Sequence, residues 1–271
     1  MLPPLLLVGG GAMGGAMLAG WREAGVSSVV VIDPSPVALA LAGDGVSVVA
    51  DAASVPDGFA PNCLILAVKP QMADAVLPGL ARFGGVALSI MAGRNVAGLG
   101  AVLGGPVVRA MPNTPAAIRQ GITVACAGPG VSAAQRDLCD ALLRAVGVVE
   151  WVDDEGLLDA VTAVSGGGPA YVFLLAELLE QAAKDEGLPA PLARLLARVT
   201  VAGSGALLAA RTEDAAELRR QVTSPAGTTE RALAVLMAEG AWPALVPRAI
   251  AAAAARSREL AAGVAVVPAT G

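Results

Sequence analysis

The stretch "LLLVGGGAMGG", residues 5–15, decides the fold of this chain. Leu5–Val8 is a short apolar run, and a glycine-rich segment follows it directly, before a helix-like pattern over residues 16–21. The segment matches G-x-G-x-x-G at positions 9, 11 and 14, in which the first glycine makes a tight turn, the second admits a pyrophosphate and the third lets the helix pack on the strand. The stretch predicts a strand, a glycine turn and a helix that bind a dinucleotide, although such a turn can also serve only to reverse a strand.

Asp33 ends the next apolar run, Val29–Ile32, where a dinucleotide fold expects an acidic residue about 20 residues after the glycines. A carboxylate there can accept a hydrogen bond from a ribose hydroxyl and would repel a 2′-phosphate, which favours NAD over NADP. Ser35 could instead serve that phosphate, or the segment "DPSP" could be an ordinary turn. The sequence leaves the choice between NADH and NADPH open.

Further apolar runs alternate with helix-like segments such as residues 72–82 and 133–146, a pattern that predicts a parallel α/β sheet. These runs cover residues 46–49, 63–68, 86–90, 107–108, 122–126 and 148–152. Two of them end in unusual loops, "AVKPQ" with Lys69 and "RAMPNTPA" with Asn113. Because ligands of open α/β sheets bind at the carboxyl ends of the strands, both loops are expected to border the cofactor, unless they are only proline-stiffened turns.

After residue 154 the β-branched runs fade, and helical patterns rich in Ala and Leu continue to the end. This change predicts a Rossmann-type, doubly wound dinucleotide-binding domain over residues 1–154 and an all-helical domain over residues 155–271. The expected helices cover residues 156–164, 170–186, 191–210, 213–221, 228–238 and 242–262. Their faces carry few charges, so some of them are expected to bury a partner subunit.

Two breaks interrupt these helical patterns, "AVSGGGPAYVF" at residues 163–173 and "VTSPAGTTERAL" at residues 222–233. Each places small residues and a proline at or before a helix start, where backbone N–H groups are accessible to a ligand. The hydroxyls of the second break are also expected to cap the helix that follows.

The composition argues against several classes of function. The 271 residues carry a net charge of −5 and no histidine, which disfavours a nucleic-acid surface and triad chemistry. The three cysteines show no CxxC spacing, so we expect reduced thiols and no metal site. The start lacks a basic segment, and the apolar stretches are interrupted before the ~18 residues of a spanning helix. We therefore expect a cytoplasmic protein with a small-molecule partner and no nucleic acid or membrane.

The motifs "GGGAMGGAM", "AVKPQ", "RAMPNTPA", "SGGGPAYVF" and "SPAGTTERAL", in this order and spacing, resemble the pyrroline-5-carboxylate reductase family over nearly the whole chain. Many dehydrogenases share the first motif, whereas the last three together are specific. The resemblance implies an N-terminal Rossmann domain, a helical C-terminal dimerisation domain and an active site shared between them. It implies reduction of 1-pyrroline-5-carboxylate, a cyclic imino acid, to L-proline with NADPH or NADH, the last step of proline biosynthesis. A homodimer, or a larger homo-oligomer built from dimers, is also implied.

Together with the residue patterns, the resemblance assigns roles to individual positions. The expected cofactor-binding residues are Gly9, Gly11, Ala12, Met13, Gly14, Asp33, Ser35, Ala67, Val68, Lys69, Pro70 and Asn113. The expected substrate-binding residues are Ser224, Gly227, Thr228 and Thr229. Lys69 and Thr229 are the catalytic candidates, and Thr229 is the hydroxyl expected nearest the imine nitrogen.

Three departures from the family pattern bear on the substrate. Gly167 stands where a serine is usual, and Ala226 stands where a glycine is usual. Arg219-Arg220 replaces a common Lys-Asp pair, which changes the local charge by about two units in the positive direction. They leave open whether six-membered cyclic imines are accepted.

This chemistry does not need a histidine. The cofactor performs the hydride transfer, so the protein must align the imine carbon and stabilise the product amine. Because an imine nitrogen is partly protonated near neutral pH, a threonine hydroxyl can suffice to orient it. The substrate carboxylate can bind N–H groups at the start of the helix after "SPAG".

Other functions fit part of the sequence. A β-hydroxyacid dehydrogenase would need a catalytic lysine in the helical half, where Lys184 stands beside Asp185 and Glu186, as on a solvated face. A broader imine reductase fits the departures at Gly167 and Ala226. A non-catalytic NAD(P)-binding sensor would bind the cofactor without turning over an imine.

Overall fold

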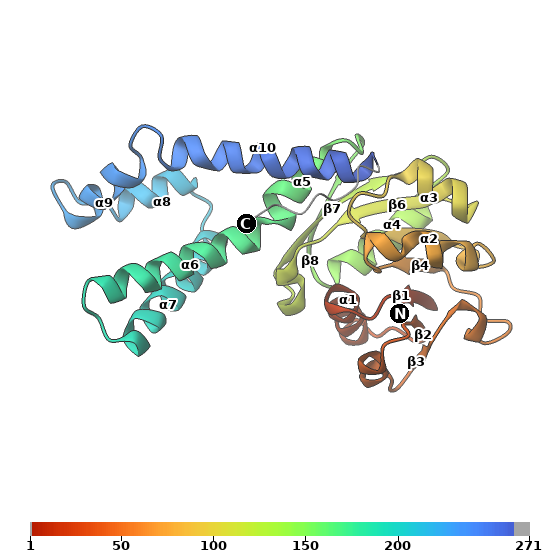
Figure 1. Cartoon of the computed structure of the whole chain (residues 1–271). Coiled ribbons are helices and arrows are strands. Elements are labelled where there is room, and N and C mark those ends of the chain that lie inside the picture. Colours follow the sequence, from red (N-terminus) through yellow and green to blue (C-terminus); the bar gives the residue numbers. More distant parts are fainter. Residues whose placement is uncertain (1, 263–271) are drawn as a thin grey trace. The chain divides into compact units, whose positions relative to one another are not determined.

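The computed structural model describes residues 2–262 and contains an eight-stranded sheet in the order β3-β2-β1-β4-β5-β6-β7-β8 (Figure 1). The strands are β1 Leu5–Val8, β2 Val29–Ile32, β3 Val46–Val49, β4 Cys63–Leu66, β5 Val86–Ser89, β6 Val107–Met111, β7 Gly121–Ala127 and β8 Gly147–Val152. The helices are α1 Ala12–Glu23, α2 Ala73–Val76, α3 Val96–Leu103, α4 Ala133–Arg144, α5 Leu157–Val161, α6 Gly168–Asp185, α7 Ala190–Ala210, α8 Ala215–Gln221, α9 Thr228–Leu236 and α10 Trp242–Ala261. A π-helical turn, Thr162–Gly166, joins α5 to α6.

Strands β1 to β6 run parallel, as expected, with Leu5 opposite Val29 on β2 and Cys63 on β4. Strand β7 is antiparallel to β6, with Arg109 opposite Cys126, and β8 is parallel to β7. The prediction of a parallel sheet throughout is therefore wrong at β6–β7. The connection between these strands, residues 112–120, is too short for the crossover that a parallel neighbour needs.

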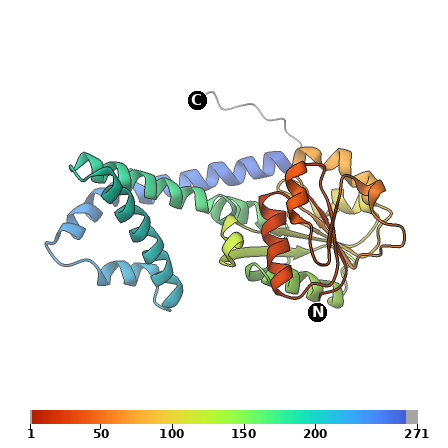
Figure 2. The same ribbon diagram turned by 90° about the horizontal axis from the view of Figure 1, so that it is seen from below.

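The sheet is buried on both faces. Leu5 and Leu7 pack with residues of α1 and α4, such as Met17 and Leu142, whereas Leu6 and Val8 pack with residues of α2 and α3. Figure 2 shows helices on both sides of the strands. Because side chains alternate between the faces of a strand, a run that is apolar at every position has two cores to fill. This arrangement confirms the doubly wound fold.

Packing divides the chain into two units. Of the described residues, the first contains 2–167 and 253–262, and the second contains 168–252. Helix α5 belongs to the first unit because Leu158 packs on Met111 and Cys126, and because the Ser257 hydroxyl donates to Asp159 Oδ1 at 2.6 Å. Packing alone does not place a boundary after residue 154, and that boundary stays a prediction.

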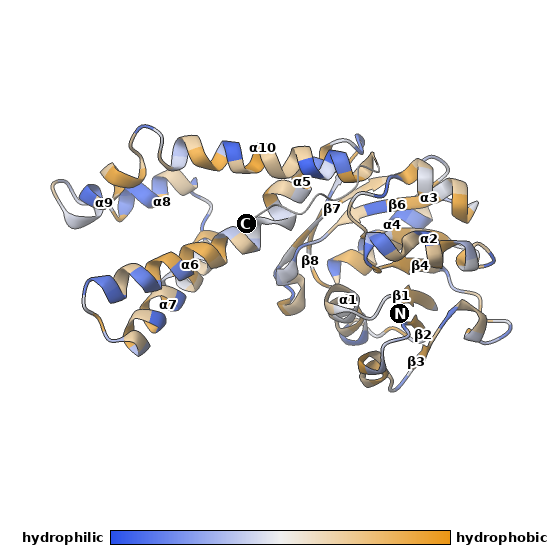
Figure 3. Ribbon diagram, viewed as in Figure 1, coloured by the Kyte–Doolittle hydropathy of each residue, from blue (hydrophilic) through white to orange (hydrophobic). Residues whose placement is uncertain are grey.

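The second unit consists of α6 to α9 and the first part of α10, close to the predicted helices. Among the described residues of α6 to α9, only Ala193 and Ala197 are buried. Large apolar side chains such as Phe173, Leu195 and Val235 are more than half exposed, and apolar colour extends along much of α6 in Figure 3. This unit therefore has almost no core of its own.

Two helical segments of residues 2–262, Leu157–Asp185 and Ala190–Ala210, are long and apolar enough to cross a membrane by length and composition. The expectation that the apolar stretches are too short is therefore wrong. Charged residues and glycines interrupt these helices, but they are too few to lower the mean hydropathy over 18 residues below that of a membrane span. Length and composition are weak criteria, because helices that pack on other protein surfaces also meet them.

Candidate functional site

The glycine turn after β1 has two positions that no side chain could occupy. Gly9 has a φ of +100°, and a Cβ on it would lie 2.7 Å from the carbonyl oxygen of Ala67, at the end of β4. A Cβ on Gly14 would lie 2.0 Å from the carbonyl oxygen of Gly9. Both glycines are buried, so the turn is fixed against β4 by close backbone packing.

Gly11 is the opposite case. A Cβ on it would meet nothing within 4 Å, and the residue is exposed at the N-cap of α1 without a side-chain cap. The exposed Ala12 and half-buried Met13 follow in the first turn of the helix. This leaves bare backbone at the positive end of α1, which suits a phosphate, so the residues present fit the pyrophosphate of a dinucleotide.

Asp33 is half-buried at the end of β2, and both of its carboxylate oxygens accept backbone hydrogen bonds. Oδ2 accepts from the N–H of Gly10 at 2.7 Å, and Oδ1 accepts from the N–H of Ser35 at 2.9 Å. Asp33 thus ties β2 to the glycine turn, a role that sequence reasoning missed. Its second lone pairs remain available to a ribose hydroxyl, so the predicted cofactor contacts of Asp33 and Ser35 stay predictions.

The loop after β4 lies beside the glycine turn, since Ala67 N donates to the carbonyl of Val8 at 2.8 Å. Val68 is half-buried, and Lys69 is exposed. Arg94, which follows β5, donates to the carbonyl of Pro70 at 3.2 Å and forms an ion pair with Asp74 at 2.8 Å. The hydrogen bond from Arg94 lowers the pKa of Asp74. Arg94 therefore secures the Lys69 loop, and no sequence pattern had singled it out.

Asn113 follows β6 and uses its side chain within the fold. Its Oδ1 accepts from the N–H of Ile122 at 3.0 Å, which fixes the start of β7. The amide nitrogen is left for another partner, so a cofactor contact by Asn113 stays a prediction.

The buried Arg109 forms an ion pair with the half-buried Glu155, a contact that sequence reasoning missed. Arg109, in β6, is 3% exposed, and its Nη1 lies 3.0 Å from Glu155 Oε1, which also accepts from the N–H of Val96 at 2.8 Å. Burial, followed by the Glu155 charge, raises the pKa of the neighbouring Cys126 thiol. The available signal was a charge within the apolar run "VVRAM", because an arginine buried there needs a carboxylate partner.

In the second unit, the loop of residues 224–229 includes the first two residues of α9, Thr228 and Thr229, and it differs from expectation. The N-cap of α9 is Gly227, without a side-chain cap, so the prediction of a hydroxyl cap is wrong. Glu230 Oε2 instead accepts from the N–H of Ala226 at 2.8 Å, and Gly227 N donates to the carbonyl of Ser224 at 3.0 Å. Within residues 2–262, no internal hydrogen bond engages the hydroxyls of Ser224, Thr228 or Thr229.

Ala226 has a φ of +58°, the left-handed region that favours glycine. The position thus adopts a conformation that suits the glycine usual in the family and that costs steric strain for an alanine. Nearby, Arg220 pairs with Glu217 at 2.5 Å, which offsets part of the added positive charge. The expected roles of residues 224–229 in substrate binding stay predictions.

The "SGGGP" break does not expose a helix start. The chain continues from α5 through the π-helical turn into α6, with Gly167 N donating to the carbonyl of Thr162 at 2.9 Å. The expectation of accessible N–H groups at this break is wrong, because the segment is the interior of a continuous helix.

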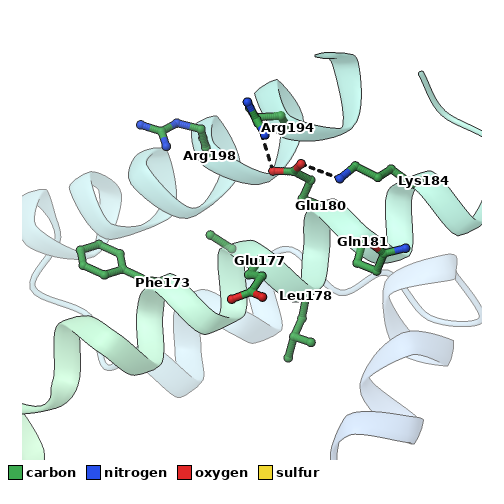
Figure 4. A pocket seen from close by; sticks show the side chains of 9 residues that line it. Phe173, Glu177, Leu178, Glu180, Gln181, Lys184, Arg194 and Arg198 are labelled. Carbon is green, nitrogen blue, oxygen red and sulfur yellow. Dashed lines mark hydrogen bonds and ion pairs between the residues drawn. The ribbon is translucent and has the colours of Figure 1, made fainter. Parts of the chain in front are cut away.

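A hollow between α6 and α7 involves none of the predicted site residues (Figure 4). Glu180 lies there between Lys184, at 2.7 Å, and Arg194, at 3.5 Å. The hydrogen bond from Lys184 lowers the pKa of Glu180. Lys184 is thus held in a surface ion pair, as a solvated position predicts.

Comparison with known proteins identifies the family of the chain. The family description "Pyrroline-5-carboxylate reductase dimerisation" matches residues 155–260, and "NADP oxidoreductase coenzyme F420-dependent" matches residues 5–93. The pyrroline-5-carboxylate reductase of Pseudomonas aeruginosa is 42% identical over 269 residues, which cover 96% of this chain and 97% of the relative. The chain belongs to the pyrroline-5-carboxylate reductase family. A reductase of the same name from Mycobacterium tuberculosis is 37% identical, over 94% of this chain and 96% of that relative.

Solved structures of family members agree with the fold of the reductase. The Coxiella burnetii pyrroline-5-carboxylate reductase is 33% identical, with a TM-score of 0.84 over 94% of this chain and 97% of that one. The Plasmodium falciparum enzyme, solved with NADP bound, is 25% identical, with a TM-score of 0.82 over 95% of this chain and 98% of that one. These findings confirm the predicted family, the Rossmann-type domain followed by helices, and the oxidoreductase class. The dimerisation match supports a homo-oligomer.

Proposed function

We propose that this reductase uses NADPH or NADH to reduce 1-pyrroline-5-carboxylate to L-proline, the last step of proline biosynthesis. The observation that carries the proposal is the glycine turn, closed at Gly9 and Gly14 and open at Gly11, in a chain 42% identical to a named reductase over 96% of its length. The turn supports binding of the cofactor. Because the sequence identity extends over nearly the whole chain, it also supports the same substrate as that of the relative.

The first unit supplies the cofactor-binding residues. The first turn of α1, from Gly11 to Gly14, binds the pyrophosphate through backbone N–H groups. Lys69 and Asn113, which follow β4 and β6, line the nicotinamide side of the cleft. When bound, the cofactor supplies the hydride. The NADP in the Plasmodium falciparum relative supports NADPH, whereas the carboxylate of Asp33 favours NADH.

The second unit supplies the substrate-binding residues. Ser224, Thr228 and Thr229 are exposed, and their hydroxyls are not engaged by the hydrogen bonds of the described chain. The N–H groups at the start of α9 bind the substrate carboxylate, because the positive end of a helix favours an anion. The Thr229 hydroxyl hydrogen-bonds the nitrogen of the substrate C=N bond. This contact holds the protonated imine in place while the carbon of that bond accepts the hydride. Lys69 is proposed to act beside the cofactor as the second catalytic residue.

The assembly follows from the exposed apolar helices. A unit with only two buried residues in α6 to α9, both alanines, requires another surface to cover it. The dimerisation match over residues 155–260 supports a second copy as that surface, in a homodimer or a larger oligomer built from dimers. A cytoplasmic location, without membrane or nucleic-acid partners, completes the proposal.

The environment of Lys184 argues against the alternative function, a β-hydroxyacid dehydrogenase. A lysine that is tied to Glu180 at 2.7 Å on the surface of α6 is poorly placed to act as a catalytic acid. A non-catalytic NAD(P)-binding sensor would bind the cofactor but would not reduce the imine, so an activity assay distinguishes it from the reductase.

The test is to mix purified enzyme with 1-pyrroline-5-carboxylate and to follow NADPH and NADH oxidation separately, while proline is measured by chromatography. We expect proline to form in equal amount to the coenzyme oxidised. Cofactor binding without proline would refute the proposal and favour a different imine or a sensor. A six-membered cyclic imine in the same assay tests the effect of the substitutions at positions 167 and 226.

A further inference from the structure

A few buried polar side-chain atoms of the first unit have no hydrogen-bond partner. In residues 2–262 there are four such side-chain atoms: Arg109 Nε, Arg109 Nη2, Ser165 Oγ and Arg256 Nη2. Three of the four belong to β6 and to the π-helical turn. Because buried polar groups are almost always hydrogen-bonded, such a group in a native protein indicates a missing partner, a ligand or a water.

The π-helical turn lies against the carboxyl end of β6. A Cβ on Gly166 would be 3.7 Å from the sulfur of Met111, the last residue of the strand, and Asn113 follows two residues later. Ser165 is therefore in a segment that packs at the edge of the sheet where cofactors bind.

The two hydroxyls of the turn are used differently. Thr162 Oγ1 donates to the carbonyl of Leu158 at 2.7 Å, within its own helix. Ser165 Oγ has no such bond and is shielded from solvent. Single π-helical turns recur at functional sites, where they interrupt the regular spacing of side chains along a helix.

Topology decides which part of a dinucleotide would lie there. In a doubly wound fold the halves of the cofactor bind on opposite sides of the pyrophosphate, which sits at the N-terminus of α1. Asp33 places the adenosine ribose on the β2 side. The carboxyl end of β6 lies on the other side, beyond β4 and β5, and this is the nicotinamide side.

We propose that the Ser165 hydroxyl is a cofactor contact, hydrogen-bonded to the carboxamide of the bound nicotinamide. A hydroxyl can both donate and accept, and it therefore matches a neutral amide, which presents one oxygen and an NH2 group. The inference rests on the proposed NAD(P)H-dependent function and adds a specific residue to it.

The experiment compares Ser165→Ala with the wild type by calorimetric titration, without substrate. Two ligands are used, NADP⁺ and 2′-phospho-ADP-ribose, which lacks the nicotinamide. If NAD⁺ binds more tightly, NAD⁺ and ADP-ribose take their place. We expect Ser165→Ala to weaken binding of the dinucleotide about 5-fold, the effect of one neutral hydrogen bond, and to leave the nicotinamide-free ligand unaffected.

Ser27→Ala is the matched control, because Ser27 donates to Leu2 at the amino end of β2, on the opposite edge of the sheet. It should bind both ligands as the wild type does. Thermal unfolding of unliganded Ser165→Ala should be unchanged or slightly raised, since an unpaired hydroxyl contributes no internal bond.

Equal affinity of the wild type and Ser165→Ala for the dinucleotide would overturn the inference, as would equal weakening of both ligands. A rise in KM for the imino acid alone would also overturn it, because the hydroxyl would then contact the substrate. These results leave the proposed function intact. A wild type that binds neither NADP⁺ nor NAD⁺ would overturn the proposed function and this inference together.

Discussion

The glycine turn of the first unit and the loop of residues 224–229 in the second are both assigned to ligands, yet they are built differently. The turn is fixed by contacts within its own unit, with Gly9 and Gly14 against backbone atoms. The loop is exposed, and the helix that follows it buries no residue. The difference teaches that the proposed cofactor turn is held in place by its own unit, whereas few contacts within the second unit fix the proposed substrate loop.

The largest expected effect comes from the closed position of the turn. Gly14→Ala places a Cβ 2.0 Å from a carbonyl oxygen and should reduce the free energy of unfolding by about 3 kcal/mol. Gly11→Ala, at the open position, should change it by less than about 0.5 kcal/mol while weakening NADP⁺ binding. Chemical denaturation and calorimetry measure both variants. Equal stability of the two would contradict the distinction between closed and open positions.

The next effect concerns the exposed helices. Leu195, on α7, is 58% exposed, and Leu195→Glu should weaken subunit association about 30-fold or more, because a charge would enter an apolar interface. Light scattering over a dilution series measures the change. Val148→Glu, at a 56% exposed position of β8, is the matched control and should leave the assembly intact. If Leu195→Glu kept the wild-type mass, α7 would not be the interface.

The substrate loop is tested by its threonine. Thr229→Val should lower kcat about 10-fold or more, the effect of losing one hydrogen bond to the reacting nitrogen, and leave cofactor affinity unchanged. Thr223→Val is the control, because the Thr223 hydroxyl donates to the carbonyl of Arg219 in the preceding helix, α8. Steady-state kinetics with saturating coenzyme separate the variants. Full activity of Thr229→Val would exclude the nitrogen contact.

The smallest effect is at Ala226. Because its φ is +58°, Ala226→Gly should relieve steric strain, and the greater freedom of glycine in the unfolded chain offsets part of the gain. We expect about 0.5 kcal/mol of added stability by thermal unfolding, and no gain for Ala226→Ser, which keeps the Cβ. Destabilisation by glycine would show that the left-handed conformation is not strained here.

Local chemistry explains what the sequence could predict. The apolar runs, the glycine pattern and the Ala/Leu-rich helices each depend on neighbouring residues, and the structure places them within a few residues of expectation. The direction of β7 depends on how the chain returns after β6, which an apolar run does not encode. The Arg109–Glu155 pair joins residues 46 positions apart, and the hydrogen bond from the N–H of Gly10 to Asp33 spans 23 positions. Such contacts follow only from the assembled sheet.

The same reasoning explains why the predicted hydroxyl cap of α9 is wrong. Serine and threonine before a helix usually cap it, but here Glu230 bonds the N–H of Ala226, and Gly227 takes the N-cap position. The hydroxyls of the loop are then left to other partners, consistent with their proposed use in substrate binding.

The most direct test of the proposed reaction is to follow the transferred hydrogen. The enzyme would be incubated with 1-pyrroline-5-carboxylate and NADPH, or NADH, deuterated at the hydride position, and the proline product analysed by mass spectrometry and NMR. We predict one deuterium per proline, on the carbon that was the imine carbon. Proline without deuterium, or coenzyme oxidation without proline, would contradict direct hydride transfer to the cyclic imine.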